Sequence, residues 1–133
     1  MAEIKQVAVI GAGQMGAGIA QVLATCGYKV MLFDGMSDAL KRGMSGIDKR
    51  LDRAIEKQTL TAAQKSEIMG RLTAAGSLTD LKSVDLVIEA IIEREDAKLS
   101  LLKELESICP AHTIFASNTS SISITKLAAG TKR

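Results

Sequence analysis

Short, continuous apolar runs alternate along this chain with longer amphipathic stretches. Four runs of strand length cover residues 7–10, 29–33, 86–89 and 113–117, and a weaker candidate near 72–78 is interrupted by Gly76 and Ser77. Runs without polar alternation are typical of parallel strands that are covered by helices on both faces. The pattern therefore predicts a mostly parallel sheet.

Helical periodicity fills the intervals between these runs. It predicts amphipathic helices over residues 15–26, 37–58, 94–108 and 124–129. Thr61 and Gln64 have the spacing of a capping box and predict the start of one more helix. Within 37–58 the apolar side chains recur at helical spacing, as Leu40, Met44, Ile47, Leu51 and Ile55.

Strands that alternate with helices predict an α/β fold, here a Rossmann-type doubly wound parallel sheet. Segment 37–75 is long for one crossover and contains two predicted helices, so we expect a projecting helical hairpin there. The chain ends at Arg133, soon after the last predicted strand, and we expect the domain over 1–133 to be incomplete at its C-terminus.

The composition excludes several classes of function. Apolar residues make up 47% of the 133 residues, whereas aromatic residues make up 2%, too few for the stacking platforms of nucleic-acid-binding modules. A net charge of +2 does not indicate a general polyanion binder. Cys26 and Cys109 lack metal-type spacing, so we expect reduced cysteines and no metal site. With no visible signal peptide or membrane-spanning run, we expect a cytoplasmic location without membrane contact.

A glycine-rich turn follows the first predicted strand and opens the first predicted helix. In this layout the first glycine permits a tight turn, the second lets the backbone approach a diphosphate, and the third lets the helix pack closely on the strand. The N–H groups and the positive dipole at the helix start then meet the phosphates. The predicted residues of this dinucleotide site are Gly11, Ala12, Gly13, Gln14, Met15 and Gly16.

Asp34, at the end of the second predicted strand, distinguishes between dinucleotides. A carboxylate at this point accepts hydrogen bonds from ribose hydroxyls and repels a 2′-phosphate, so it favours NAD over NADP. Lys41 and Arg42 would favour NADP, but they come two helical turns later. FAD-binding folds share the glycine pattern, which leaves FAD as an alternative.

The predicted helix over 37–58 also has a basic side, formed by Lys49, Arg50, Arg53 and Lys57. Cations on a projecting helix suit a phosphate-rich substrate handle such as coenzyme A. Three acidic residues are interleaved with them, namely Asp48, Asp52 and Glu56. An ordinary solvated helix face is therefore the alternative.

Polar residues follow the two last predicted strands. Glu89, Ala90 and Glu93 come at the end of one, and the run from Ser117 to Ser121 follows the other. Ligands of such sheets bind beyond the carboxyl ends of the strands, so these residues should face the nicotinamide half, although a polar turn is the alternative for the second run. His112, the only histidine, precedes the last strand, which places it at the opposite edge and excludes it as a catalytic base.

Three signatures in this order resemble the amino-terminal domain of the 3-hydroxyacyl-CoA dehydrogenases. They are residues 9–21, the run Asp85-Leu86-Val87-Ile88-Glu89-Ala90, and residues 116–125. The resemblance covers essentially all of the chain, and the bacterial 3-hydroxybutyryl-CoA members are the most similar. It implies NAD(H)-dependent interconversion of a 3-hydroxyacyl-CoA and a 3-oxoacyl-CoA by hydride transfer.

The resemblance also implies roles for residues at matching positions. The glycine turn and Asp34 would hold the adenosine half of NAD. Ala90, Glu93 and Lys98 match positions near the nicotinamide ribose and its surroundings. Asn118 and Ser120 match residues beside the nicotinamide and the substrate oxygen, which makes them the catalytic candidates in this chain. Arg53 and Lys57 match basic positions of a hairpin that contacts coenzyme A, whereas Arg50 falls where some members have serine.

In this family the catalytic histidine lies in a His-Phe-Phe-Asn-Pro motif, followed by its partner glutamate. From the sequence we expect both, and the C-terminal helical domain that supplies much of a homodimer interface, to be absent from residues 1–133. We accordingly expect this chain alone to be inactive and to self-associate through uncovered apolar surface. The alternatives are a non-catalytic NAD-binding module or sensor, and another hydroxyacid dehydrogenase, against which the run from Ser117 to Ser121 argues.

Overall fold

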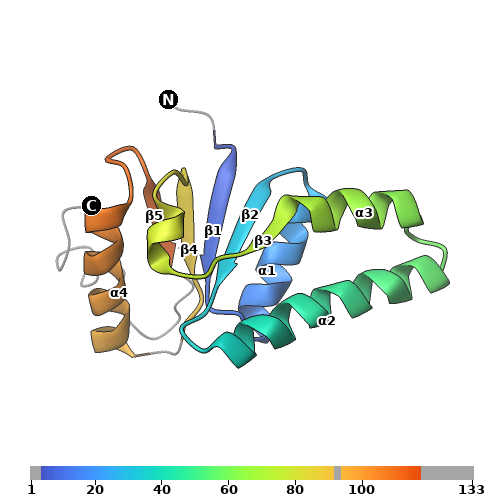
Figure 1. The fold of residues 1–133 in the computed structure, drawn as a ribbon, viewed down its shortest axis with the longest axis horizontal. Coiled ribbons are helices and arrows are strands. Elements are labelled where there is room, and N and C mark those ends of the chain that lie inside the picture. The colour runs from blue at the N-terminus through green and yellow to red at the C-terminus, as the bar shows by residue number, and fades with distance from the viewer. Residues whose placement is uncertain (1–3, 92–93, 118–133) are drawn as a thin grey trace.

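The computed structural model describes residues 4–91 and 94–117, and within them the α/β alternation is confirmed (Figure 1). The elements in chain order are β1 (Gln6–Ile10), α1 (Gln14–Thr25), β2 (Lys29–Phe33), α2 (Ser37–Glu56), α3 (Ala62–Arg71), β3 (Leu72–Ala74), the 3-10 helix η1 (Leu78–Leu81), β4 (Leu86–Glu89), α4 (Glu95–Ile108) and β5 (Ile114–Ser117). The predicted strands agree with β1, β2, β4 and β5 to within one residue. The helix predicted over 124–129 lies outside the described residues.

The segment near 72–78, predicted as a weak strand, is where the structure differs most from the prediction. Its strand, β3, has only three residues, and the chain then enters η1 instead of continuing. The side chain of Asp80 accepts hydrogen bonds from the N–H groups of Gly76 and Ser77, at 2.9 and 3.3 Å, and so stabilises this turn. Polar side chains that bond to nearby backbone groups favour turns over extended strands.

All five strands are parallel and stand in the order β3-β2-β1-β4-β5. The chain moves outward from β1 to β3 and then crosses to β4 on the other side of β1. Ile10 is in register with Phe33 of β2 and with Glu89 of β4, so these strands end together. The change of direction between β1 and β4 is the point at which open parallel sheets bind their ligands.

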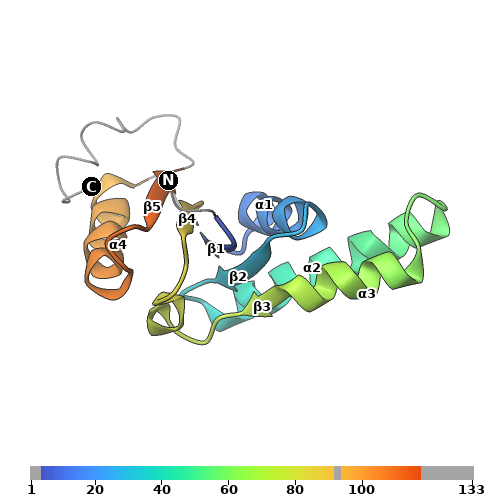
Figure 2. The same ribbon diagram turned by 90° about the horizontal axis from the view of Figure 1, so that it is seen from above.

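Two hydrophobic clusters cover the two faces of the sheet (Figure 2). One cluster packs α1, α2 and α3 against Val9 and Leu32. The other packs η1 and α4 against Ala8 and Val87. This is the doubly wound arrangement predicted from the sequence.

Helices α2 and α3 run side by side and extend away from the sheet as a hairpin (Figures 1 and 2). The predicted capping box at its turn is confirmed: the N–H of Gln64 donates to Thr61 Oγ1 at 3.1 Å, and the N–H of Thr61 donates to Gln64 Oε1 at 2.9 Å. Ile47 and Leu51 of the predicted apolar stripe are buried. Among the described helices, none combines the length and the apolar character that crossing a bilayer requires.

Candidate cofactor-binding site

Steric contacts fix the shape of the glycine turn between β1 and α1. Gly11 has a φ of +105°, which side chains rarely tolerate, and its N–H donates to the carbonyl oxygen of Phe33 at 2.7 Å. A Cβ on Gly11 would lie 2.5 Å from the carbonyl oxygen of Ala90, and one on Gly16 only 1.7 Å from that of Gly11. Neither position can accept a side chain, because the opposing atoms belong to the backbone.

Gly13 has a different environment, because a Cβ there would meet no atom within 4 Å. Gly13 is the N-cap of α1 and forms no side-chain cap, so the first N–H groups of the helix have neither an intrahelical acceptor nor a capping side chain. Gln14 and Met15, in the first turn, are exposed. An uncapped helix start behind a glycine fits an anionic diphosphate, which the N–H groups and the helix dipole would stabilise.

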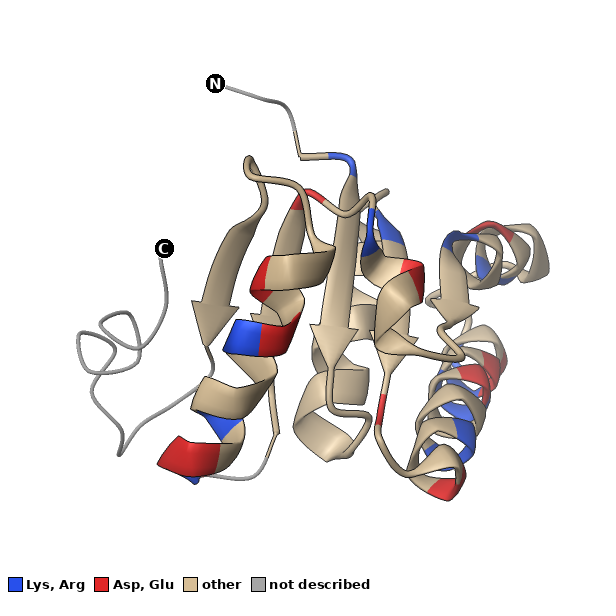
Figure 3. Ribbon diagram, turned by 60° about the vertical axis from the view of Figure 1, so that its left-hand side comes forward, with Lys and Arg blue, Asp and Glu red and all other residues tan. Residues whose placement is uncertain are grey.

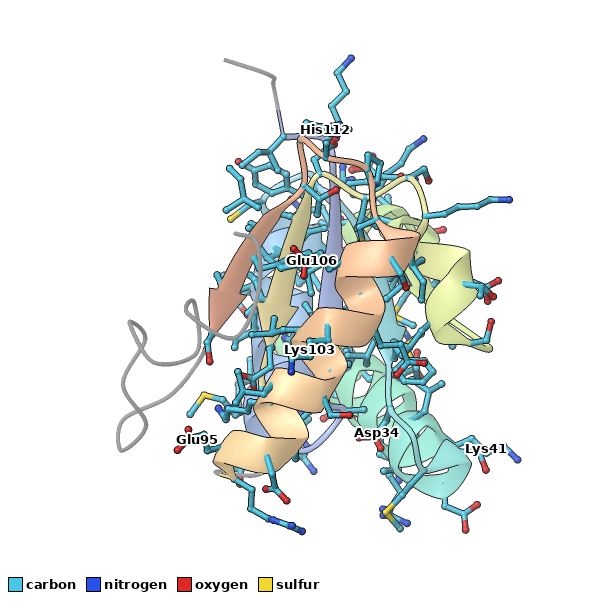
Figure 4. The ribbon with its side chains drawn as sticks, turned by 90° about the vertical axis from the view of Figure 1, so that its left-hand side faces the viewer. Asp34, Lys41, Glu95, Lys103, Glu106 and His112 are labelled. Carbon is cyan, nitrogen blue, oxygen red and sulfur yellow. The ribbon has the colours of Figure 1, made fainter. Side chains whose placement is uncertain are left out.

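Asp34 holds the turn from the end of β2. Its two carboxylate oxygens accept hydrogen bonds from the N–H groups of Ala12 and Met36, each at 2.8 Å. A carboxylate has about four acceptor positions, so about two stay available for ribose hydroxyls. Lys41, which would favour NADP, is exposed and extends outward from α2 (Figure 4). The arrangement fits NAD.

A buried ion pair lies at the carboxyl end of β4. Glu89 and Lys98 are both 0% exposed, and Lys98 Nζ lies 3.0 Å from Glu89 Oε1. Glu89 also accepts hydrogen bonds from the N–H of Ile91, at 2.8 Å, and from Ser117 Oγ. One carboxylate therefore joins β4, α4 and β5 beside the predicted cofactor site.

Sequence reasoning placed Glu89 at this edge but missed its partner. A carboxylate that ends a buried apolar strand requires a counter-charge or hydrogen bonds, and this requirement was the available signal. Lys98 was expected near the nicotinamide ribose, and in the structure its ammonium pairs with Glu89. Ala90 donates its N–H to the carbonyl oxygen of Ile10 at 2.8 Å and lies beside the glycine turn. The predicted residues Glu93, Asn118 and Ser120 lie outside the described residues.

His112 lies at the opposite edge of the sheet from Asp34, as predicted (Figure 4). Its Nε2 is 3.0 Å from Asp85 Oδ1, just before β4. Hydrogen bonds from the N–H groups of Gln6 and Lys5, and then from His112, lower the pKa of Asp85 to about 2. His112 therefore belongs to a structural contact remote from the glycine turn. Within 4–91 and 94–117, no cluster of His, Cys, Asp and Glu has the make-up of a metal site.

Basic and acidic residues are interspersed along α2 (Figure 3), but the structure separates their side chains into different contacts. Lys65 of α3 lies 2.7 Å from both Asp48 and Asp52, and these two carboxylates raise the pKa of Lys65. Arg53 and Lys57 are exposed, and no ion pair in the described part of the chain involves either. The hairpin thus pairs Asp48 and Asp52 internally and leaves Arg53 and Lys57 facing solvent.

The prediction that Arg50 belongs to this exposed basic side was wrong. Arg50 is half-buried, and its Nε donates to Gln21 Oε1 of α1 at 2.6 Å. Its Nη2 is buried without a hydrogen-bond partner in the described structure. Arg50 therefore connects α2 to α1 and is not a free cation of the hairpin.

Comparisons with known proteins agree with this geometry. Residues 6–133 match the family model described as "3-hydroxyacyl-CoA dehydrogenase, NAD binding domain". The chain is 48% identical over 132 residues to 3-hydroxybutyryl-CoA dehydrogenase of Bradyrhizobium diazoefficiens, a match that covers 99% of this chain and 45% of that protein. The chain thus spans about half the length of the curated relatives it matches.

Solved structures of 3-hydroxybutyryl-CoA dehydrogenases also resemble this chain. The crystal structure of (S)-3-hydroxybutyryl-CoA dehydrogenase from Ralstonia eutropha superposes with a TM-score of 0.94 at 45% identity, over 98% of this chain and 46% of that one. The crystal structure of 3-hydroxybutyryl-CoA dehydrogenase from Escherichia coli K12 has a TM-score of 0.93 at 43% identity, over 96% and 27%.

Proposed function

We propose that this chain holds NAD(H) while a 3-hydroxyacyl-CoA and a 3-oxoacyl-CoA are interconverted. The chain belongs to the 3-hydroxyacyl-CoA dehydrogenase family, as its NAD-binding domain. The observation that carries the proposal is the uncapped helix start behind Gly13, with Asp34 at the end of the neighbouring strand. The choice of 3-hydroxybutyryl-CoA as substrate and a cytoplasmic location are the finer parts of the proposal, and they rest on the sequence resemblance.

Different residues are proposed to bind different parts of the cofactor. The N–H groups of the first turn of α1 bind the diphosphate, and Asp34 accepts hydrogen bonds from the adenosine ribose. When bound, NAD supplies the hydride acceptor, and the chain contributes orientation and the exclusion of water. Ala90, Glu93 and Lys98 are proposed around the nicotinamide ribose. Asn118 and Ser120 are proposed to orient the substrate oxygen by hydrogen bonds.

The hairpin is the proposed site for the coenzyme A part of the substrate. Arg53 lies in the last turn of α2, Lys57 is the C-cap of the same helix, and both are exposed. Because Lys65 engages Asp48 and Asp52, those carboxylates compete less for the neighbouring cations. A phosphate group that meets two adjacent cations gains charge-assisted hydrogen bonds from both.

Coenzyme A binding tests this assignment. We expect isothermal titration calorimetry to detect weak binding of coenzyme A to the wild-type chain, and the Arg53→Ala/Lys57→Ala variant to bind roughly tenfold more weakly. The estimate assumes that each exposed charge contact contributes up to about 1 kcal/mol. NADH affinity should be unchanged, since neither residue lies at the glycine turn.

The matched control is Lys82→Ala/Lys103→Ala, which removes two exposed charges away from the hairpin. It should bind coenzyme A as the wild type does. A wild-type chain that binds NADH but gives no response to coenzyme A would contradict the substrate proposal and would favour a non-catalytic NAD sensor.

We further propose that this chain self-associates, as the sequence predicts. Met15 and Val22, on the outer side of α1, are 60% and 61% exposed, and Ile114 on β5, the last of the described strands across the sheet, is 52% exposed. Exposed apolar side chains and sheet edges favour association. In sedimentation velocity, we expect the sedimentation coefficient to rise with concentration and Val22→Lys/Ile114→Lys to reduce this rise. A monodisperse monomer at millimolar concentration would refute the proposal.

A further inference from the structure

Gly43, in the middle of α2, lies directly against the glycine turn. A Cβ built on Gly43 would be 2.7 Å from the carbonyl oxygen of Ala12 and 3.0 Å from the Cβ of Ala12. Both residues are buried. Because the nearest opposing atom belongs to the backbone, a methyl group at this position requires the helix or the turn to move.

A second contact joins the same two elements. The carboxylate of Asp34 accepts hydrogen bonds from Ala12 of the turn and from Met36, the N-cap of α2. Helix α2 is therefore linked to the glycine turn through Asp34 at its N-cap and contacts the turn again about two turns later, at Gly43. Two points of attachment fix the direction of a helix, whereas one would act as a hinge.

The length of α2 amplifies any change at this contact. The helix has 20 residues and is about 30 Å long at 1.5 Å per residue. Arg53 lies about 15 Å beyond Gly43 on the same scale, so a tilt of about 4° at Gly43 moves Arg53 by about 1 Å. In the other direction, a displaced Ala12 carbonyl moves the N–H groups that follow it in the turn.

We propose that Gly43 is a positioning residue that sets the direction of the hairpin relative to the cofactor-binding turn. It acts through Ala12 and touches neither the cofactor nor the substrate. The lack of a side chain at 43 allows the turn to keep the geometry in which its N–H groups face the diphosphate, and a displacement of about 1 Å in such a site has a large effect. The consequence for coenzyme A rests on the function proposed above, whereas the consequence for NADH does not.

The test compares Gly43→Ala with Gly46→Ala, one turn further along the same helix. A Cβ on Gly46 would meet no backbone atom and only Nη1 of Arg50, at 3.3 Å, so the methyl group requires a small shift of this one side chain, which Gln21 holds through Nε. Both substitutions gain the same intrinsic helix propensity, so the difference between the two variants isolates the contact with Ala12. We expect Gly46→Ala to bind NADH as the wild type does and Gly43→Ala to bind it about tenfold more weakly, measured by fluorescence titration.

A thermal melt without ligand separates positioning from simple destabilisation. A purely structural role would lower the melting temperature of Gly43→Ala while the folded protein kept its NADH affinity, and that result would overturn the proposal. If Gly43→Ala does not fold, Ala12→Gly/Gly43→Ala replaces it, because removing the Ala12 methyl relieves one of the two contacts. This double variant should still bind NADH at least fivefold more weakly than Ala12→Gly alone, and equal affinity would overturn the proposal.

Coenzyme A binding provides a second, separable measurement. Gly43→Ala is expected to bind coenzyme A more weakly than Gly46→Ala, since Arg53 and Lys57 move with the helix. If the wild-type chain binds no coenzyme A, the proposed substrate fails, and the NADH comparison still decides the role of Gly43.

Discussion

The Gly16→Ala variant is expected to lose NADH binding altogether and to unfold more easily than the wild type. A Cβ at this position would lie 1.7 Å from the carbonyl oxygen of Gly11, so α1 must move away from the end of β1. Forced overpacking of this kind costs about 1–3 kcal/mol or more, although glycine to alanine in a helix normally gains about 1 kcal/mol. Chemical denaturation measures the stability, and fluorescence titration measures NADH binding.

Two other glycines provide matched controls for this result. A Cβ on Gly18, in the same helix, would meet no atom within 4 Å, so Gly18→Ala should keep or gain stability and bind NADH normally. Gly13→Ala should also fold normally, because the space is open and the φ of Gly13 is −68°. Its methyl group would occupy the space assigned to the diphosphate, so NADH binding alone should weaken. Equal NADH affinity in the three variants would contradict the proposed cofactor site.

Replacing Lys98 with methionine is expected to lower the free energy of unfolding by about 3–5 kcal/mol, because it leaves the carboxylate of Glu89 buried without its cation. Lys103→Met, on the exposed side of the same helix, should change the stability by less than about 0.5 kcal/mol. Urea denaturation of both variants measures this difference.

The double variant Glu89→Gln/Lys98→Met distinguishes a buried charge from lost packing. Its amide oxygen can accept the hydrogen bond from the N–H of Ile91, its NH2 group can donate to Ser117 Oγ, and no unpaired charge remains, so most of the stability should return. NADH titration then adds a second result. A double variant with recovered stability and weakened NADH binding would support the proposed place of Lys98 near the nicotinamide ribose. If Lys98→Met alone lowers the free energy of unfolding by less than about 1 kcal/mol, the ion pair does not stabilise the packing of β4 against α4.

Local signals in the sequence were sufficient to predict most of the described fold. The strands follow from continuous apolar runs, and the helix predicted over 15–26 ends before Gly27, whose φ of +105° is typical of the residue that follows a helix C-cap. The capping box at Thr61 was readable because all its partners lie within four residues. The η1 turn was missed, although Ser77 and Asp80 have capping spacing, because a four-residue element has too few positions to show a period.

Contacts between distant elements could not be predicted in the same way. Glu89 and Lys98 meet only because β4 and α4 pack together, and nothing in their spacing specifies a pair. Arg50 flanks the apolar stripe of α2, but the periodicity alone does not reveal that Gln21 of α1 is its hydrogen-bond partner. Gly43 was overlooked since a glycine within a helix has no sequence signature that reveals the atom opposite it. The surroundings of Arg50 and Gly43 depend on how α2 packs against α1 and the glycine turn, which is a tertiary property.

The two hydrogen bonds of Asp34 have a consequence for how cofactor preference can evolve. Adapting this site to NADP requires removal of the negative charge, but the same carboxylate holds Ala12 and the start of α2. A buried N–H left without an acceptor costs about 1–3 kcal/mol. An apolar replacement of Asp34 would therefore lower the affinity for both NAD and NADP, although it would reduce the preference for NAD. Only a neutral side chain that still accepts hydrogen bonds, such as asparagine or serine, offers a viable first step. Because Asp34 both selects the cofactor and holds the glycine turn, few single substitutions can change the preference from NAD to NADP and keep the site intact.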